Sequence, residues 1–186
     1  MSEHYVAAIV ALLLKLTSAS PDDVQKHVDA AMDAATRHAV PVELLLGMGF
    51  IESRYNANAL SRLECVGKVC KRVTGAWNAT TKPPNAKPPW FCGPLQSGGH
   101  VPWDDCQKMR ADVTYGYNAG ARELVIWMNV RECRNAVDKT RCALAGYGAG
   151  YPGVKIASTM AYPSNVLGVA AKLRAFALKR SREPKS

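Results

Sequence analysis

The sequence predicts a mostly α-helical protein that forms a single domain over residues 1–186. Three observations support this fold class. Apolar residues recur at helical spacing in several segments, a cysteine- and proline-rich stretch interrupts them, and no strand pair is indicated outside that stretch. A chain of 186 residues is long enough to bury one sizeable core.

Residues 1–40 are expected to form N-terminal helices. The run YVAAIVALLL at 5–14 resembles a signal-peptide core, but Glu3 and no basic residue precedes it, and Lys15 interrupts it. Since the run is too short to span a bilayer, we interpret it as a first buried helix, with an uncleaved export signal as the alternative. Ser20-Pro21-Asp22-Asp23 predicts the start of a second helix, which is expected to end near His38.

The character of the chain changes between Arg62 and about Trp103. Five prolines lie between residues 83 and 94, a composition that a long helix cannot accommodate. We therefore predict a cysteine-containing loop or short β-hairpin inserted at about 62–92. Pro41 is expected to open a helix that runs to Ser53 before this insertion, and further helices are predicted at 111–129, 140–149 and 163–180.

Six cysteines lie at positions 65, 70, 92, 106, 133 and 142, which is many for a protein of a reducing cytosol. Six cysteines allow fifteen complete pairings, and the sequence does not choose among them. A zinc site is the rival interpretation, but no C-x-x-C spacing is present and the four histidines do not cluster with the cysteines. We expect disulfides, among them a local Cys133–Cys142 link, and no metal or cofactor.

The net charge of +9 suggests a polyanionic partner, such as nucleic acid, an anionic membrane or an acidic cell-wall polymer. No motif for nucleic-acid binding is present, so nucleic acid is not expected. The last residues, 176–186, form a basic tail, and the apolar residues just before and within it fit one helical face. We interpret the segment as a last helix with a solvated tail, and docking to an anionic envelope surface is the alternative.

Glu52 is the first candidate catalytic residue. At about 100° per residue, it falls between Met48 and Leu45 around the predicted helix, on an apolar face. A carboxyl group held there is partly desolvated, which raises its pKa and suits it to act as a general acid. The alternative is that Glu52 only ends the helix and turns outward, although a negative charge is mildly unfavourable at a helix C-terminus.

The residues around Glu52 resemble the first signature of the soluble lytic transglycosylase family, relatives of goose-type lysozyme. Glu52-Ser53 stands at a helix end, and Ser61 closes the segment as the serine of that family does. Four further elements follow in the order of the family: Gly93-Pro94-Leu95-Gln96, Asp112 with Gly120–Leu124, Ala145–Gly150, and Tyr162–Val166. The resemblance covers about 42–173 and implies a lysozyme-like fold with a catalytic core at 41–175.

The family's Tyr-Asn-Ala-Gly signature has two candidates in this chain. Tyr117–Gly120 spells it literally, but it follows Gln96 too closely for the intervening helix of the family. The later segment Tyr147–Gly150 precedes Tyr162, as the family order requires, so we prefer Tyr147. The chain departs from the family pattern at Pro94, Leu95 and Gly148.

The resemblance implies cleavage of the β-1,4 bond between N-acetylmuramic acid and N-acetylglucosamine in peptidoglycan. Glu52 would protonate the leaving oxygen and then act as a base, while the N-acetyl group of the substrate replaces a second carboxylate and the muramyl 6-hydroxyl closes a 1,6-anhydro ring. By family position, Ser61 would hold that acetamido group, and Gln96, Tyr147 and Tyr162 would line the site.

Other functions stay open. Hydrolysis, as in goose-type lysozyme, would need acids that position water, and Glu64, Asp104, Asp105 and Asp112 are the candidates, unless they are ordinary surface charges. A non-catalytic glycan-binding module and a cysteine-stapled interaction protein are further alternatives. The resemblance suggests a monomeric bacteriophage endolysin, made in the host cytoplasm and acting on the cell wall after release. A bacterial autolysin and a virion-associated lysin are the other possible settings.

Overall fold

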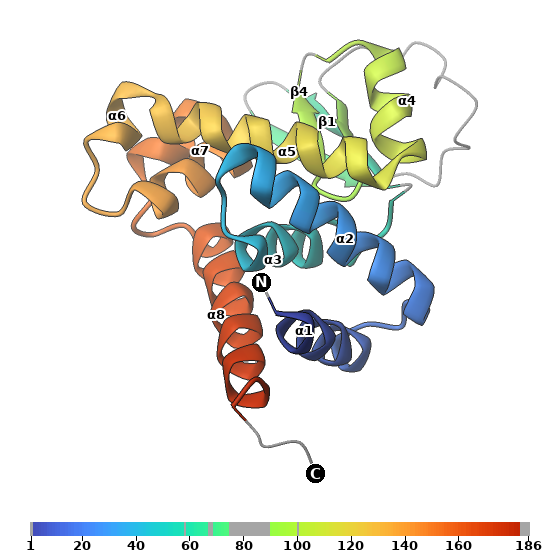
Figure 1. Cartoon of the computed structure of the whole chain (residues 1–186). Coiled ribbons are helices and arrows are strands. Elements are labelled where there is room, and N and C mark those ends of the chain that lie inside the picture. The colour runs from blue at the N-terminus through green and yellow to red at the C-terminus, as the bar shows by residue number, and fades with distance from the viewer. Residues whose placement is uncertain (1, 58, 67–68, 75–89, 100, 183–186) are drawn as a thin grey trace.

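The structure is a computed structural model, and it describes residues 2–57, 59–66, 69–74, 90–99 and 101–182. This part of the chain is mostly helical, as the sequence predicts (Figure 1). Its helices are α1 (Glu3–Leu16), α2 (Pro21–His38), α3 (Val42–Ser53), α4 (Trp103–Ala111), α5 (Val113–Asn129), α6 (Arg131–Arg134), α7 (Lys139–Lys155) and α8 (Ala161–Arg180). Its strands are β1 (Leu60–Val66), β2 (Val69–Thr74), β3 (Trp90–Cys92) and β4 (Ser97–Gly99).

Helix α3 lies at the centre of the molecule, between α2 and α8 (Figure 1). Its residues from Leu44 to Gly49 are all buried, as expected for a helix that is apolar all round. Glu43 is half-buried and accepts a hydrogen bond from the hydroxyl of Tyr5 on α1. Beyond Gly49, the last turn of α3, which carries Glu52, is half-buried.

The N-terminal segment forms two helices of the fold. Helix α1 packs against α2 and α8, so residues 5–14 lie in a helix of the fold, which buries Ala8, Ile9 and Leu13 and leaves its other side chains partly or fully exposed. Helix α2 begins where the sequence predicts, because the Ser20 hydroxyl accepts a hydrogen bond from the N–H of Asp23 at 3.2 Å. No described helix is both long and apolar enough to cross a membrane.

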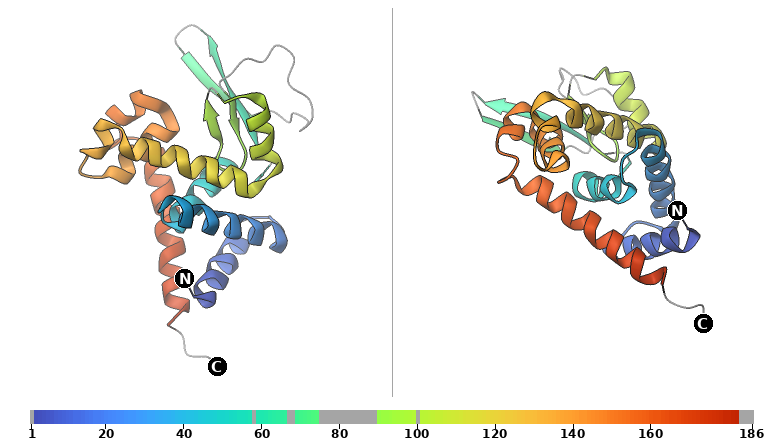
Figure 2. Two further views of the ribbon diagram at one scale, coloured as in Figure 1. Left: turned by 45° about the horizontal axis from the view of Figure 1, so that its top comes forward. Right: turned by 60° about the vertical axis from the view of Figure 1, so that its left-hand side comes forward.

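The predicted insertion forms a small antiparallel sheet with the strand order β2-β1-β3-β4. Strands β1 and β2 make the expected hairpin, in which Cys65 stands opposite Cys70. The sheet extends past the predicted end of the insertion, because β3 and β4 form a second hairpin that reaches Gly99. The sheet and α4 form one end of the molecule, and α1 and the end of α8 form the other (Figure 2).

Two disulfides are described. Cys133–Cys142 joins α6 to α7, so the predicted local link is confirmed. Cys92–Cys106 joins β3 to α4, and the sequence did not select this pair. None of the four cysteines whose side chains are described is free.

Three details of the helices differ from the sequence prediction. Helices α4 and α6 were not expected, because each is too short to show a clear helical period. The helix predicted at 140–149 continues as α7 to Lys155, but its helical geometry breaks at Gly150, whose φ is 65°. The predicted end is therefore the position of a kink.

Candidate functional site

Glu52 lies in the last turn of α3 and is half-buried, as are its neighbours Ile51 and Ser53. From Leu44 to Gly49, α3 is buried on all sides. The sequence predicts one apolar face for this helix, whereas the structure buries its whole circumference over these residues. The carboxyl group therefore stands at the border between the core and the molecular surface. This position gives a side chain both partial desolvation and access to a ligand.

The backbone turns sharply just after Glu52. Arg54 and Tyr55 both adopt the left-handed conformation, with φ of 54° and 63°, which costs free energy for residues other than glycine. Side chains fix this turn: the buried hydroxyl of Tyr55 donates to the carbonyl oxygen of Leu46 at 2.8 Å, and the Arg54 guanidinium lies 4.0 Å from the centre of the Phe50 ring. This strained turn ends α3 two residues after Glu52.

Residues 93–98 form a turn that lies against this helix end, and we call it the Gln96 turn. The Ser53 hydroxyl donates to the carbonyl oxygen of Pro94 at 2.7 Å, which ties the end of α3 to the turn. Gln96 is buried with a φ of 50°, and its side-chain amide donates to the carbonyl oxygen of Gly93 at 3.1 Å. Left-handed residues other than glycine thus occur on both sides of the Ser53–Pro94 contact.

Helix α5 supports the Gln96 turn with two glycines. A Cβ atom on Gly116 would lie 2.6 Å from Cδ of Pro94, and one on Gly120 would lie 2.5 Å from Cδ1 of Leu95. Any larger side chain at either position would push the turn away from the helix. The two glycines stand one helical turn apart, and the Gln96 turn packs directly on the backbone between them.

Helix α7 holds the same turn from another direction. The hydroxyl of Tyr147 donates to the carbonyl oxygen of Leu95 at 2.8 Å and lies 2.8 Å from Oγ of Ser97, which is buried. The structure therefore brings Tyr147 and Gln96 to one turn. Tyr162, on α8, is half-buried and packs against Gly148 of α7, next to Tyr147.

Ser61 lies on β1, where its backbone stands opposite Phe91 of β3 and Thr74 of β2. The side chains of Ser61 and Glu64 lie outside the described residues, so the roles predicted for them are not examined by the structure. Strand β3 leads directly into the Gln96 turn, which places the backbone of Ser61 near one side of it.

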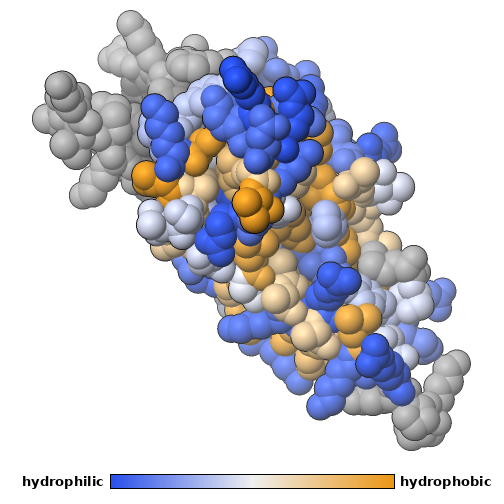
Figure 3. Space-filling model, turned by 90° about the vertical axis from the view of Figure 1, so that its left-hand side faces the viewer, coloured by the Kyte–Doolittle hydropathy of each residue, from blue (hydrophilic) through white to orange (hydrophobic). Residues whose placement is uncertain are grey.

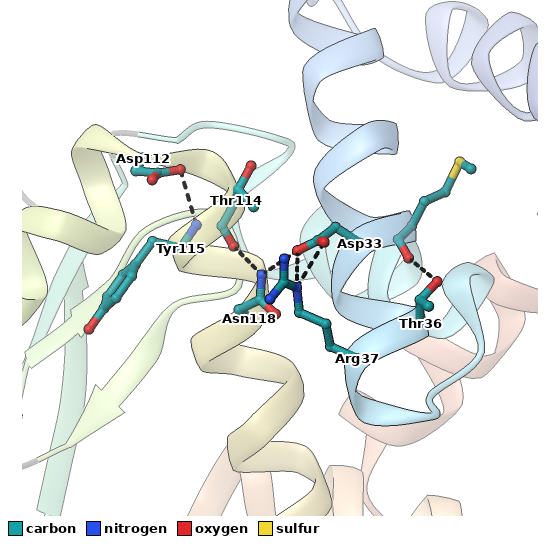
Figure 4. A network of polar contacts seen from close by, with 8 residues as sticks. Asp33, Thr36, Arg37, Asp112, Thr114, Tyr115 and Asn118 are labelled. Atoms are coloured by element: carbon teal, nitrogen blue, oxygen red, sulfur yellow. Dashed lines mark hydrogen bonds and ion pairs between the residues drawn. The ribbon is translucent and has the colours of Figure 1, made fainter.

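The other candidate tyrosine, Tyr117, lies in the core. It is fully buried, and its hydroxyl is 3.3 Å from Nδ1 of His27. The next residue, Asn118, joins α5 to α2 by donating to Asp33 at 2.8 Å, where Asp33 also accepts from Arg37 (Figure 4). These donors hold the pKa of the Asp33 carboxyl below its usual range. Tyr117 and Asn118 thus make structural contacts between α5 and α2.

The aspartates considered for a hydrolytic mechanism have structural contacts of their own. Asp112 caps α5 by accepting from the N–H of Tyr115 at 3.1 Å. Asp105 pairs with Lys108 at 3.7 Å in the first turn of α4, where Asp104 also lies. Such positions are typical of acids that stabilise the start of a helix.

The structure adds a carboxyl group that the sequence analysis did not single out. Glu123 is half-buried on α5, and its Oε2 accepts a hydrogen bond from the N–H of Gly98 at 3.3 Å. Burial, the largest cause, together with the nearby charge of Glu52, raises the pKa of Glu123 to about 7, while the Gly98 N–H, the Trp127 indole and Arg122 oppose the rise. Glu123 was recognisable in the sequence, because it follows Gly116 and Gly120 on one helical stripe.

An aromatic pair adjoins Glu123. The Trp127 ring packs on Gly146 of α7, where a Cβ atom would lie 2.3 Å from it, and its centre is 5.3 Å from that of Tyr151. Tyr151 is exposed, with 56 % of its surface accessible. The face of the molecule formed by α6, α7 and α8 shows apolar side chains gathered along its middle with hydrophilic groups at the margins (Figure 3).

Among the described residues, no group of His, Cys, Asp or Glu side chains could hold a metal ion. Comparisons of the chain with protein-family models, with curated proteins and with solved structures find no match. The family resemblance therefore rests on the motif residues, and the site rests on its geometry.

Proposed function

We propose that this chain cleaves the glycan strands of peptidoglycan between N-acetylmuramic acid and N-acetylglucosamine, with Glu52 as the general acid and base. One observation carries the proposal. Three motif segments that lie far apart in the sequence meet at the Gln96 turn: Ser53 bonds to Pro94, and Tyr147 bonds to Leu95. These contacts support a shared site for the glutamate, glutamine and tyrosine motifs, with a half-buried carboxyl group at its border.

The mechanism we propose is that of a lytic transglycosylase. Glu52 donates its proton to the glycosidic oxygen as the bond to C1 breaks, and the N-acetyl group of the substrate stabilises the positive charge that develops. The ionised Glu52 then accepts the proton of the muramyl 6-hydroxyl, whose oxygen bonds to C1 and closes the 1,6-anhydro ring. The carboxyl group ends in its starting state, so no net proton is consumed.

The proposed binding residues contribute in different ways. The Tyr147 hydroxyl is engaged by Leu95 and Ser97, which supports a role in holding the Gln96 turn rather than in binding sugar directly. Ser61, Gln96 and Tyr162 retain the roles that the family resemblance implies. The exposed Tyr151 ring adds an apolar surface on which a sugar ring could stack.

The lysozyme-like architecture is part of this proposal. Its support is a buried central helix with a glutamate in its last turn, followed by a small antiparallel sheet and then by further helices, of which α8 packs on the central one. A bacteriophage endolysin that acts on the cell wall of its host is the biological setting we propose, and the basic end of α8 is the surface proposed to meet an anionic envelope.

Hydrolysis is the second candidate, and Glu123 is the observation that favours it. Glycosidases that hydrolyse their substrate use two carboxyl groups near the scissile bond, and the charge of Glu52 acts on Glu123. In a hydrolytic reaction water would replace the muramyl 6-hydroxyl, and the products would carry reducing ends.

Mass spectrometry of muropeptides released from purified peptidoglycan tests both candidates. Anhydro-muramyl products that fall by roughly 10²–10⁴-fold with Glu52→Gln establish the transglycosylase. Reducing ends with the same dependence establish the hydrolase. The matched control is Glu132→Gln on α6, an exposed glutamate outside the site. If the wild-type protein sediments with peptidoglycan but releases nothing over a range of pH and salt, it is a binding module and not an enzyme.

A further inference from the structure

Helices α5 and α7 present an aromatic pair, Trp127 and Tyr151, which we call the aromatic platform. The two rings meet edge to face, with 5.3 Å between their centres and 70° between their planes. Trp127 is half-buried and Tyr151 is exposed. Because an edge-to-face contact covers at most one face of each ring, Trp127 supports Tyr151 from the side of the protein, and Tyr151 forms the open part of the platform.

The kink in α7 places Tyr151 on this surface. Helical geometry breaks at Gly150, with φ of 65° and ψ of −158°, a conformation that favours glycine. Tyr151 therefore begins a second arm of the helix. This arm packs back on the first, because a Cβ atom on Gly153 would lie 2.3 Å from the carbonyl oxygen of Ala145. Tyr151 comes after the segment Tyr147–Gly150 that resembles the family signature, so the resemblance assigns no role to it.

Helix α7 joins the aromatic platform to the Gln96 turn. The Trp127 ring packs on Gly146, where a Cβ atom would lie 2.3 Å from it. The next residue is Tyr147, whose hydroxyl donates to the carbonyl oxygen of Leu95 in the turn at 2.8 Å. The residue that supports the ring and the residue that holds the turn are thus neighbours on one helix.

Helix α5 makes a second connection to the same turn. Glu123 lies one helical turn before Trp127 and accepts a hydrogen bond from the N–H of Gly98, at the end of the turn, at 3.3 Å. Near the start of the turn, the carbonyl oxygen of Pro94 accepts the hydroxyl of Ser53 at 2.7 Å. The aromatic platform and the end of α3 therefore adjoin the two ends of one turn.

An exposed aromatic ring beside a carboxyl group can bind a sugar ring. The face of a pyranose consists of C–H groups, which pack on the electron-rich face of an aromatic ring, and its hydroxyl groups lie around the rim. An ionised carboxyl group offers about four acceptor sites. The Gly98 N–H and the Trp127 indole use two of those on Glu123, so acceptor capacity is left for a hydroxyl or amide group at the rim of a sugar.

We propose that the aromatic platform is a second glycan-binding subsite, and that it makes the protein selective for strands long enough to reach it. This inference rests on the proposed function, which supplies a strand of N-acetylated sugars as the ligand. A strand that lies across the Gln96 turn presents one sugar to the end of α3 and a sugar further along to Tyr151. A fragment too short to cover both gains no binding energy from the platform.

The dependence of KM on strand length is the first test, with soluble glycan fragments from disaccharide to decasaccharide. In the wild-type protein, we expect KM to fall at the length that reaches Tyr151. Tyr151→Ala should raise KM for the longer fragments by roughly three- to ten-fold, with kcat and the values for shorter fragments unchanged. Tyr151→Phe keeps the ring and should keep the wild-type dependence.

The matched control is Tyr115→Ala, which removes another exposed tyrosine at the opposite end of α5 and should leave KM unchanged at every length. A Tyr151→Ala protein with the wild-type length dependence overturns the inference and leaves the proposed function intact. An equal rise in KM for short and long fragments also overturns it, because a purely structural role of Tyr151 would act on both.

Binding without turnover is the second test. In Glu52→Gln, the longest fragment is titrated while tryptophan fluorescence is recorded, because Trp127 contacts the Tyr151 ring. We expect a saturable change that disappears when Trp127→Phe is added, and an affinity that is roughly three- to ten-fold weaker when Tyr151→Ala is added. No change, or a change that persists without Trp127, overturns the inference. A wild-type protein that releases no muropeptide overturns the proposed function, and this titration then decides the subsite by itself.

Discussion

At the scale of single residues, the candidate site concentrates backbone strain and perturbed ionisation. Among the described residues other than glycine, four have positive φ, and three of these are Arg54, Tyr55 and Gln96 at the site. Such conformations persist only where the surrounding contacts enforce them. Here the enforcing contacts are the Tyr55 hydroxyl on α3 and the packing of the Gln96 turn on α5.

The ionisation of Glu123 should be visible in the stability of the fold. Its pKa is raised to about 7 from an ordinary 4.5, so the folded state holds the proton more tightly than the unfolded state. The contribution of Glu123 to the free energy of unfolding should then fall as pH rises from 4.5 to 7, by roughly 1–3 kcal/mol. Thermal denaturation of Glu123→Gln should show a smaller loss of stability over this range. Equal losses in both proteins would contradict the raised pKa.

His27 should contribute the opposite dependence over nearly the same pH range, so each contribution is isolated by comparing its variant with the wild type. It is buried beside Tyr117 and Tyr55, and burial lowers its pKa from 6.5 to about 4, although Asp23 opposes the shift. The unfolded state gains a proton first, so the contribution of His27 to the free energy of unfolding should fall by roughly 3 kcal/mol as pH drops from 6.5 to 4. Chemical denaturation of His27→Gln across this range should lack most of that slope, even if the variant is less stable throughout.

At the scale of the elements, the contact between α5 and the Gln96 turn can be tested by adding one methyl group. Gly120→Ala places a Cβ atom against Leu95 and Ser97, so we expect a loss of about 1–3 kcal/mol in stability and a loss of muropeptide release as the turn shifts. Gly168→Ala on α8 is the matched control. Nothing lies within 4 Å of its Cβ, so it should stabilise the helix by about 0.5–1 kcal/mol and leave release unchanged.

The two described disulfides offer a second comparison between elements. They close loops of similar size, with sequence separations of 14 and 9, so removing either by double serine substitution should cost about 3 kcal/mol. Only Cys92–Cys106 adjoins Gly93 and the Gln96 turn. At a temperature where all proteins are folded, its removal should therefore reduce muropeptide release more than removal of Cys133–Cys142. Equal effects on release would contradict the importance of the turn.

The sequence predicted the elements with strong local signals and missed those that depend on distant contacts. The start of α2 at Ser20 and the helix that ends at Ser53 follow from capping and periodicity, and the proline-rich composition indicates a loop or short hairpin at about 62–92 without placing its strands. Helix α4 was missed because it is short and polar, and it is stapled to β3 by a disulfide whose pairing the sequence does not specify.

In the candidate site too, the sequence identifies single residues but not the contacts between distant segments. Glu52 could be selected because its helical position is a local property. Its contact with the rest of the site could not, because the Ser53–Pro94 bond joins residues 41 positions apart and the Tyr147–Leu95 bond joins residues 52 apart. The argument used for Glu52 also applies to Glu123. It lies on the same helical stripe as Gly116 and Gly120, and glycines on a stripe allow close packing, so the sequence indicates that this carboxyl group faces the protein.

At the scale of the whole molecule, the net charge of +9 leaves open which basic residues meet an anionic partner. The apolar face of α8 is used inside the fold, because Leu173 and Ala177 are buried and the helix packs on α1. The basic side chains of its last turns, including Lys172 and Lys179, point outward and are exposed. This end of α8 can therefore attract an anionic surface by charge, but its apolar face is not free to insert into a bilayer.

Two double variants with the same net charge separate local docking from overall charge. Lys172→Glu with Lys179→Glu, and Arg131→Glu with Lys139→Glu on α6 and α7, each change the charge by −4, from +9 to +5. With about 1 kcal/mol per basic residue near an anionic surface, the α8 variant should bind anionic vesicles about thirty-fold more weakly at low salt. The α6–α7 variant should bind nearly as well as the wild type. Equal weakening in both would mean that total charge, rather than the end of α8, determines binding to anionic vesicles. The expected difference should shrink as salt screens it.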